Sequence, residues 1–294
     1  MVEITREIAA SYAPQLNSED NKYTRGVAEL MVGESAFAGA GVLAARAASR
    51  MGAGYVRAYT SPEAAAALHV AQPSCVCRSF NQYCEDVHDA QEGKPRAAAV
   101  GCGFVGDDAS NVRVLDVLAN TAAPVLVDGG GLGALSSTVA KRLVAQRTAQ
   151  GFHTVVTPHG GEASRMLVIG CGEDVPRYED PALRAMRIAH EYGVACVLKG
   201  PVTYIALPGT ASPDEVSTIS CGTAALAKAG TGDVLAGAIT ALMAQGVRTK
   251  HACELGVYLH ALAGVIASEK TCALAVCAED VVEALPYALA ALLK

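Results

Sequence analysis

The sequence predicts an α/β protein in which helices cover both faces of a largely parallel sheet. Short runs rich in β-branched residues alternate with longer Ala-rich segments, and this alternation is typical of strand–helix–strand units. Hydrophobic residues make up 51% of the 294 residues and charged residues 18%, so a large core is expected. We find no internal repeat and expect a single domain over residues 1–294.

The alternation places each element of this fold. Strands are expected at 27–32, 55–59, 97–100, 125–127, 154–157, 196–198 and 202–206. Helices are expected at 39–50, 62–71, 109–119, 137–146, 161–168, 181–191, 232–245, 250–268 and 278–292. The last third of the chain is nearly all helical in this interpretation and should form one covering layer.

Two segments lack this regular pattern. Residues 72–96 mix charged side chains with Cys, Gln and Asn; they could form an excursion or a lid, and their composition is unlike that of an interdomain linker. Residues 172–181 lie between two expected helices and are interpreted as a surface loop.

Composition excludes several classes of protein. The formal net charge is −6 and no Lys/Arg-rich run occurs, so nucleic acid and anionic membranes are not expected as partners. The N-terminal segment is polar and mixed in charge, unlike a secretory signal. The longest apolar runs, 234–244 and 261–267, are too short to span a membrane. We therefore expect a cytoplasmic protein.

The ten cysteines do not indicate a disulfide scaffold or a metal centre. No C-x-x-C pair occurs, and the closest pair is Cys75 and Cys77. No group of His, Cys and Asp has the spacing of metal ligands along the chain. We expect buried, reduced thiols that act as small hydrophobic side chains.

The first of three glycine-rich stretches is Gly101-Cys-Gly-Phe-Val-Gly106, which matches G-x-G-x-x-G. It lies between an expected strand and helix, with Asp128 at the end of the next strand, and this pattern favours a dinucleotide-binding oxidoreductase. Two observations oppose that interpretation. The stretch lies in mid-chain, and Asp107 and Asp108 crowd the helix N-terminus where a pyrophosphate would bind.

The second stretch runs from Val127 to Gly133 as V-D-G-G-G-L-G. Here a strand ends in an acid followed by glycines, and ligands of open α/β sheets bind beyond the carboxyl ends of strands. The glycines could equally serve a tight turn that needs positive φ. Both interpretations remain open for this loop.

The third stretch, Gly230-Thr231-Gly232-Asp233, opens an apolar helix. A helix start presents unpaired amides and the positive end of a dipole, which together bind anions. Asp233 could simply favour that dipole. An acid beside an anion site also suits phosphoryl transfer, because the amides hold phosphate charge while the carboxylate accepts a hydroxyl proton.

Further candidates follow two other strands. Glu162 in Thr157-Pro-His-Gly-Gly-Glu162 could orient Mg²⁺-bound water, or it could be an ordinary acid at a helix start. Lys199, followed by Gly200, could reach a nucleotide phosphate or be solvated. His260 lies in an apolar helix and is interpreted as a core residue.

Together these segments resemble the NAD(P)H-hydrate dehydratases of the ribokinase-like superfamily. The resemblance covers nearly the whole chain, and its most specific motif is Ala229-Gly-Thr-Gly-Asp-Val-Leu-Ala-Gly237. Other matching segments are 21–26, 33–40, 51–55, 101–103, 127–128, 157–162, 198–200, 259–264 and 278–286. The resemblance implies a three-layer α/β/α sandwich without an N-terminal epimerase domain, so any epimerase partner would be a separate protein. We also expect a homo-oligomer.

The family repairs NADH or NADPH whose nicotinamide ring has been hydrated, using ADP or ATP as phosphate donor together with Mg²⁺. By resemblance, Asp233 is the catalytic base, and Glu162 holds the metal. The implied anion-hole residues, which also bind the nucleotide, are Gly230, Thr231 and Gly232. The other implied nucleotide-binding residues are Lys199, Gly200 and Thr203. The implied substrate-binding residues are Gly39, Ala40, Gly101, Gly103, Asp128, His159, Glu162 and Asp233.

The chain departs from the family pattern at several positions. The family usually carries an acid and an Asn where this chain has Gly130 and Gly133, and Pro where it has Cys102 and Gly160. Two alternatives therefore stay open beside the dehydratase. One is a small-molecule kinase of the same fold, for a vitamin or a sugar, and the other is a non-catalytic nucleotide-binding protein. The sequence does not decide between ADP and ATP.

Overall fold

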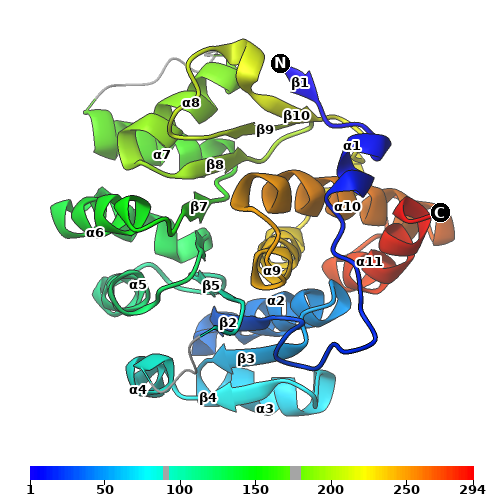
Figure 1. Ribbon diagram of the computed structural model, residues 1–294, viewed down its shortest axis with the longest axis horizontal. Coiled ribbons are helices and arrows are strands. Elements are labelled where there is room, and N and C mark those ends of the chain that lie inside the picture. The colour runs from blue at the N-terminus through cyan, green and yellow to red at the C-terminus, as the bar shows by residue number, and fades with distance from the viewer. Residues whose placement is uncertain (89–92, 173–179) are drawn as a thin grey trace.

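A central sheet organises the molecule in the computed structural model, which describes residues 1–88, 93–172 and 180–294 (Figure 1). In chain order its strands are β1 (Val2–Glu3), β2 (Val27–Met31), β3 (Tyr55–Tyr59), β4 (Val76–Arg78), β5 (Arg96–Val100), β6 (Val125–Val127), β7 (Thr154–Val156), β8 (Ala195–Leu198), β9 (Thr203–Ala206) and β10 (Ser217–Ile219). They lie in the order β1-β10-β9-β8-β7-β6-β5-β2-β3-β4. Strand β9 is antiparallel to β8 and β10, and the other neighbouring pairs are parallel.

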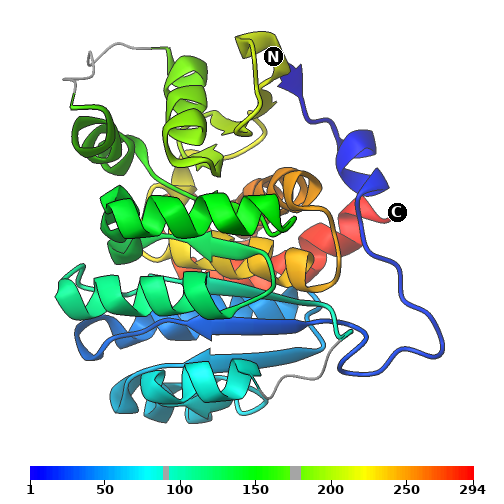
Figure 2. The ribbon, with the colours of Figure 1, turned by 60° about the vertical axis from the view of Figure 1, so that its left-hand side comes forward.

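Helices cover both faces of this sheet (Figures 1 and 2). One layer contains α2 (Ala38–Arg50), α9 (Thr231–Ala244), α10 (Thr249–Lys270) and α11 (Ala278–Leu292), with α1 (Arg6–Ser11) and α3 (Pro62–Ala71) at its margins. The other contains α4 (Tyr83–His88), α5 (Asp108–Asn120), α6 (Thr138–Ala149), α7 (Gly160–Cys171) and α8 (Pro181–Tyr192). Successive strand residues alternate between the layers: Val155 packs with the first and Val156 with the second.

The predicted three-layer architecture is confirmed, and the expected strands and helices are present with ends shifted by a few residues. Five short elements were not predicted from the pattern: β1, β4, β10, α1 and α4. The last third was interpreted as nearly all helical, but it also contains β10, which pairs with β9 and β1. The residues of β10 are Ser-Thr-Ile, which lack the apolar run that marks the equally short β6 and β7.

The interpretation of residues 72–96 as an excursion or a lid is wrong. This segment contains β4, which pairs in parallel with β3 and extends the sheet. It also contains α4, where Asp86 accepts a hydrogen bond from the hydroxyl of Tyr59 at 3.1 Å. Residues 89–92, and residues 173–179 of the expected surface loop, lie outside the described residues.

Helix α9 is the central helix of its layer and positions the site described below. Every residue from Val234 to Ala244 is buried. A Cβ atom on Gly237 would clash with the carbonyl oxygen of Ala44 in α2, so glycine allows the two helices to pack backbone to backbone. The N-terminus of α9 is thereby held at the edge of the sheet where the parallel strands end.

The structure bears on two expectations from composition, which concern membrane-spanning helices and the cysteines. No helix within the described ranges is long and apolar enough to cross a membrane. The nine cysteines whose side chains are described are free, as expected. They are not all buried, however, because Cys221 and Cys272 are exposed.

Candidate active site

Charged side chains from separate strands meet the N-terminus of α9. Asp128 follows β6 and Lys199 follows β8, and the Lys199 Nζ lies 3.1 Å from the Asp128 Oδ1. A Cβ atom on Gly232 would lie 3.1 Å from that Nζ and 3.7 Å from the Asp128 Oδ2. The Sγ of Cys102 and one oxygen each of Asp128 and Asp233 all lie within 4.8 Å of one another. The sequence-predicted residues Asp128, Lys199, Gly232 and Asp233 therefore form one cluster.

The strand order explains why these residues meet. Strands β5 to β8 are adjacent and parallel, so their carboxyl ends share one edge of the sheet. Asp128 precedes a 3-10 helix (Gly129–Ser136), but its side chain does not cap that helix. Its carboxylate is therefore directed to Lys199 instead of to the local backbone, and the residue is only 3% exposed.

The first turn of α9 is open to an anion. Gly230 precedes the helix at φ 92°, and a Cβ there would lie 2.7 Å from the Leu43 Cδ1, so glycine is required. The helix has no side-chain cap. Among the described residues, the amides of Gly232 and Asp233 have no backbone acceptor. Unpaired amides at a helix start attract negative charge.

Thr231 contributes to this turn differently from the prediction. Its hydroxyl donates to the carbonyl oxygens of Leu226 and Lys228, at 2.8 and 2.9 Å, and its amide lies 3.4 Å from the second of these. The side chain is buried. Thr231 therefore holds the turn in place, whereas Gly232 and Asp233 supply the open amides.

Asp233 is the acid whose ionisation the site alters most clearly. Burial, followed by the charge of Asp128, raises its pKa to about 6, and the thiol of Cys102 and the charge of Lys199 act in the opposite direction. Burial alone would lower the pKa of Lys199, but Asp128 and Glu162 outweigh it and raise that pKa overall. Lys199 therefore stays cationic, while Asp233 can accept a proton near neutral pH.

His159 and Glu162 lie at the start of α7, at the margin of the cluster. The Glu162 Oε2 accepts from the His159 amide at 2.8 Å, and the His159 Nδ1 accepts from the Gly161 amide at 3.1 Å. The imidazole Nε2 lies 3.4 Å from the Glu162 Oε1. Glu162 thus caps the helix, and its charge also raises the pKa of Asp233. The structure thus shows the helix-start role of Glu162, and its role towards Mg²⁺-bound water stays a prediction.

The two other glycine loops pack against each other by their backbones. A Cβ on Gly101 would clash with the carbonyl oxygen of Asp128, and a Cβ on Gly130 would clash with that of Phe104. A Cβ on Gly133, in contrast, would meet nothing within 4 Å. A side chain at position 130 therefore cannot be accommodated here, whereas one at position 133 can.

The same packing corrects the dinucleotide interpretation of residues 101–106. Asp107 caps α5 by accepting from the Ser110 amide at 2.8 Å, so this helix start is not open to a pyrophosphate. The positive φ values of Gly101, Gly103 and Gly106 serve close chain packing; a Cβ on Gly103 would lie 2.7 Å from the Phe37 carbonyl oxygen. The oxidoreductase interpretation is therefore wrong.

Two side chains of the site were not predicted as functional. The thiol of Cys102 is fully buried beside Asp128 and Asp233, and burial with these acids raises its pKa well above the usual value. His260 of α10, taken as a core residue, is buried next to the backbone of Thr231, and burial lowers its pKa to about 4. His260 is therefore neutral near the anion-binding turn, and its Nε2 has no hydrogen-bond partner among the described residues. No sequence pattern marks either contact.

Glu34 holds the loop of residues 101–106 from the other side. Its carboxylate accepts from the Val105 amide at 2.8 Å and from the Ser110 hydroxyl at 3.1 Å, and it pairs with Arg113. Its own amide donates to the Gly103 carbonyl at 3.1 Å. Glu34 is thus a positioning residue for the loop that carries Cys102.

The remaining predicted residues lie around this cluster. Ala40, at the start of α2, is close to the loop, because a Cβ on Gly103 would lie 2.8 Å from the Ala40 Cβ. Gly39 faces open space, because a Cβ atom there would meet nothing within 4 Å. Gly200 lies between β8 and β9, and Thr203 is the first residue of β9. In the described part of the chain no hydrogen bond joins either residue to the cluster.

The donor set accommodates a hard divalent cation only in part. Mg²⁺ prefers carboxylates, water and phosphate oxygens. Asp128 and Glu162 offer carboxylates near the α9 turn, although Lys199 and the His159 amide already use some of these oxygens. The thiol of Cys102 is not a suitable magnesium ligand. Cys102, Asp128 and Asp233 nevertheless form a potential ligand group that spacing along the sequence did not reveal.

The fold and this cluster define an α/β protein of the ribokinase-like type, with an open helix start facing a buried acid at the carboxyl edge of its sheet. The family model of the NAD(P)H-hydrate dehydratases matches residues 28–287. The chain belongs to that family.

Individual relatives agree with this assignment. The chain is 32% identical to the ADP-dependent (S)-NAD(P)H-hydrate dehydratase of Neisseria meningitidis, over 85% of this chain and 80% of that protein. It is also 32% identical to the bifunctional NAD(P)H-hydrate repair enzyme Nnr of Mycobacterium leprae, over 88% of this chain. It spans 49% of that bifunctional protein, so it matches about half of the length of such relatives.

Solved structures give the same result. The Bacillus subtilis ADP/ATP-dependent NAD(P)H-hydrate dehydratase, co-crystallised with ATP and Mg²⁺, superposes with a TM-score of 0.83. It is 28% identical, and the match covers 99% of this chain and 98% of that one. A hydroxyethylthiazole kinase of Pyrococcus horikoshii superposes with a TM-score of 0.60 at 16% identity, which indicates the shared fold alone.

Proposed function

We propose that this chain dehydrates hydrated NADH or NADPH, with ADP or ATP as phosphate donor. The observation that carries the proposal is Asp233, an acid whose pKa is raised to about 6, directly beside open amides at the start of α9. The names of the relatives in Neisseria meningitidis and Bacillus subtilis support the substrate and the donor.

For the first step we propose a role for each group. Asp233 takes the proton of the ring hydroxyl as the oxygen of that hydroxyl attacks the terminal phosphorus of the nucleotide. The amides of Gly232 and Asp233 hold the charge that develops on the transferred phosphoryl group. Lys199, kept cationic by Asp128, adds a positive charge beside that position. The nucleotide leaves with one phosphate fewer.

In the second step the phosphate is eliminated from the ring. The carbon–oxygen bond breaks, the neighbouring ring carbon loses a proton, and the double bond of the reduced nicotinamide is restored. The same amides and Lys199 can stabilise the departing phosphate. A bound Mg²⁺ would neutralise phosphate charge in this site, and Asp128 and Glu162 are the residues that would hold it, directly or through water.

The direct test is recovery of NADH absorbance from purified hydrated NADH with Mg²⁺. Parallel reactions contain ATP, ADP or no nucleotide. We expect recovery only with a nucleotide, and the productive one identifies the donor. No recovery by folded, nucleotide-binding protein contradicts the proposal.

A kinase of the same fold is the second candidate, favoured by Gly130 and Gly133, which leave one loop of the site without side chains. A kinase would release a stable phosphorylated alcohol instead of restored NADH. A panel of hydroxylated vitamins and sugars, with product analysis by mass spectrometry, separates the two. A non-catalytic protein would turn over neither hydrated NADH nor any compound of this panel.

Several wider expectations remain proposals. We propose that the chain acts as one domain, in the cytoplasm, and as a homo-oligomer. Where an epimerase is needed, we propose that it is supplied by a separate protein. Size-exclusion chromatography with light scattering measures the oligomeric state directly.

A further inference from the structure

A cavity lies at the opposite edge of the sheet from the cluster around Asp233. It has a volume of about 780 Å³, within the usual range for small-molecule sites. We call it the basal cavity. Its walls come from the amino ends of β5, β7 and β8, the segment after β9 and the α9–α10 connection, represented by Arg96, Thr154, Ala195, Leu207 and Val247. The cluster around Asp233 lies at the carboxyl ends of these parallel strands, so the two sites are separate.

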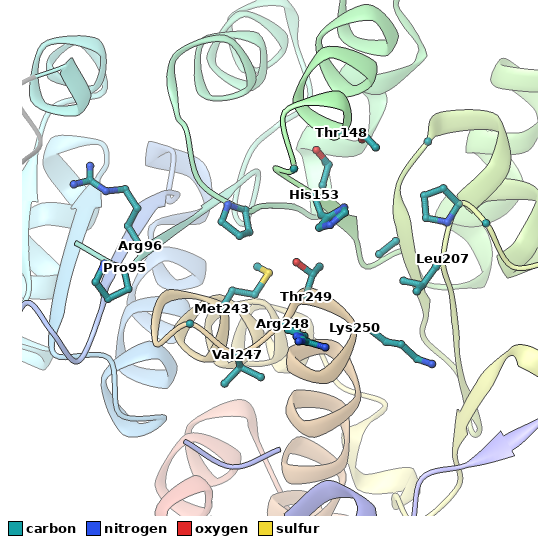
Figure 3. Close-up of a pocket in the computed structure, with 18 residues that line it drawn as sticks. Pro95, Arg96, Thr148, His153, Leu207, Met243, Val247, Arg248, Thr249 and Lys250 are labelled. Atoms are coloured by element: carbon teal, nitrogen blue, oxygen red, sulfur yellow. The ribbon is translucent and has the colours of Figure 1, made fainter. Parts of the chain in front are cut away.

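The ionisable residues that line the basal cavity are all basic. Its 18 lining residues include Arg96, His153, Arg248 and Lys250 but no Asp or Glu. This contrasts with the net charge of −6 on the whole chain. Figure 3 shows His153, Arg248 and Thr249 around the same space, whereas Arg96 extends away from it. Lys250 is 3.8 Å from a carboxylate of Glu254, which does not line the cavity.

Arg248 is the cation most available to a ligand. It is exposed, and within the described residues its guanidinium has no hydrogen bond or ion pair. An arginine fork of this kind matches the oxygens of a phosphate. A ligand phosphate would therefore not have to displace an existing partner.

The start of α10 adds backbone donors to the same wall. This 22-residue helix begins at Thr249, directly after Arg248, and has no side-chain cap. Among the described residues, the amides of Thr249 and Lys250 have no backbone acceptor. An uncapped helix start favours an anion, and here it lies beside an unpaired arginine.

A buried polar residue also belongs to the wall of the basal cavity. Thr154 lines the basal cavity and is 1% exposed, yet its hydroxyl oxygen has no hydrogen-bond partner in the described structure. Buried hydroxyl groups are normally paired.

Apolar residues complete the cavity and suggest the shape of the rest of the ligand. They are Pro95, Pro124, Leu207, Pro208, Met243 and Val247. Proline and methionine surfaces suit a flat ring, and the cavity has room for a mononucleotide. We propose that the basal cavity binds a phosphate-bearing small molecule with a ring body, of the mononucleotide class, at a site distinct from the active site.

Photolabelling with 8-azido-AMP tests this proposal, because peptide mapping by mass spectrometry separates the basal cavity from the active site. In the full-length protein we expect label within residues 207–209 or 243–250. An excess of AMP or inorganic pyrophosphate should prevent this labelling, whereas adenosine, which has no phosphate, should not. Absence of label there, including absence because a second copy of the chain covers the cavity, overturns the proposal. Equal protection by adenosine overturns the role of the phosphate.

The variant Arg248→Ala should lower the basal labelling about tenfold, the usual effect of removing a charged partner from a phosphate. Arg142→Ala is the matched control, because it removes an exposed arginine of α6 that does not line the cavity. It should label like the wild type. If the basal cavity of Arg248→Ala is labelled as strongly as that of the control, the proposal is contradicted.

The result is independent of the proposed dehydratase. Neither variant alters a residue of the cluster around Asp233, so recovery of NADH and labelling of active-site peptides should be unchanged in both. Basal labelling in a protein without dehydratase activity would support this inference while contradicting the proposed function.

Discussion

Two glycine-rich regions of this protein use glycine for different purposes. At the start of α9, Gly230 gives the chain a turn that leaves the amides of Gly232 and Asp233 open. In the paired loops after β5 and β6, glycine instead removes side chains so that two backbones touch, as where Gly130 meets Phe104. The first region can bind a ligand charge, whereas the second shapes and supports the site.

The difference shows that glycine content alone does not identify a ligand-binding loop. Open amides without acceptors mark the first region, and predicted side-chain clashes mark the second. The formal G-x-G-x-x-G match belongs to the second class. A change in the first region should therefore alter the reaction, and a change in the second should alter stability.

The largest effect is expected from Asp233→Asn. Loss of the base should lower the rate of NADH recovery by about 10²–10⁴-fold, the usual contribution of a general base. Nucleotide binding should persist, because the amides of the α9 turn remain. The checks are steady-state rates and calorimetric nucleotide titration. A variant at the wild-type rate would remove Asp233 from its assigned role.

Gly130→Ala tests the packing role of the paired loops. Its methyl group would clash with the Phe104 carbonyl, so we expect a loss of about 1–3 kcal/mol in the free energy of unfolding. Gly133→Ala is the matched control, because its methyl group meets nothing within 4 Å, and it should change stability by less than about 0.5 kcal/mol. Chemical denaturation measures both. Equal effects would contradict the packing argument.

Asp233→Asn should also stabilise the folded protein at neutral pH. The pKa of Asp233 is raised from 3.8 to about 6, so its contribution to stability is fully present below pH 3.8 and is lost as the pH rises through 6. At pH 7 the ionised carboxylate is therefore unfavourable, and removing it should raise the free energy of unfolding by about 1–3 kcal/mol. The gain should shrink towards pH 4. Denaturation curves at pH 7 and pH 4 measure this, and a gain that is the same at both would contradict the raised pKa.

The smallest effect is expected from Cys102→Ala. In the wild type, kcat/KM should fall about tenfold per pH unit below about pH 6, as Asp233 becomes protonated. The Cys102 thiol lowers the pKa of Asp233 by hydrogen bonding, so its removal should move this acid limb to higher pH. The pH dependence of kcat/KM for both proteins is the measurement. A limb that moves to lower pH would exclude this hydrogen bond.

Most of the fold could be predicted from the sequence because the long helices and buried strands have strong periodic patterns. The sequence also marked Asp128 and Lys199 at strand ends and Asp233 at a helix start, and the family resemblance assigned all three to one site. It could not place Cys102 beside Asp233 or His260 against Thr231, because these contacts join distant segments without a shared motif. Short elements of mixed polarity, such as β4 and α4, lack the apolar runs that revealed the short strands β6 and β7.

The basal cavity could not be predicted from the sequence for a related reason. It is built mainly from strand starts and connecting segments, with His153 and Arg248 supplied by different parts of the chain. Neither residue belongs to a recognisable motif. Only the folded backbone brings them together.

The backbone contact between Gly237 and Ala44 has a consequence for genetic experiments. Any side chain at position 237 would push α9 away from α2, and the N-terminus of α9 carries the groups assigned to the reaction. A screen of random variants for lost activity should therefore recover substitutions of Gly237 as readily as those of residues in the site. The activity should therefore require this interior glycine, although it lies outside the site.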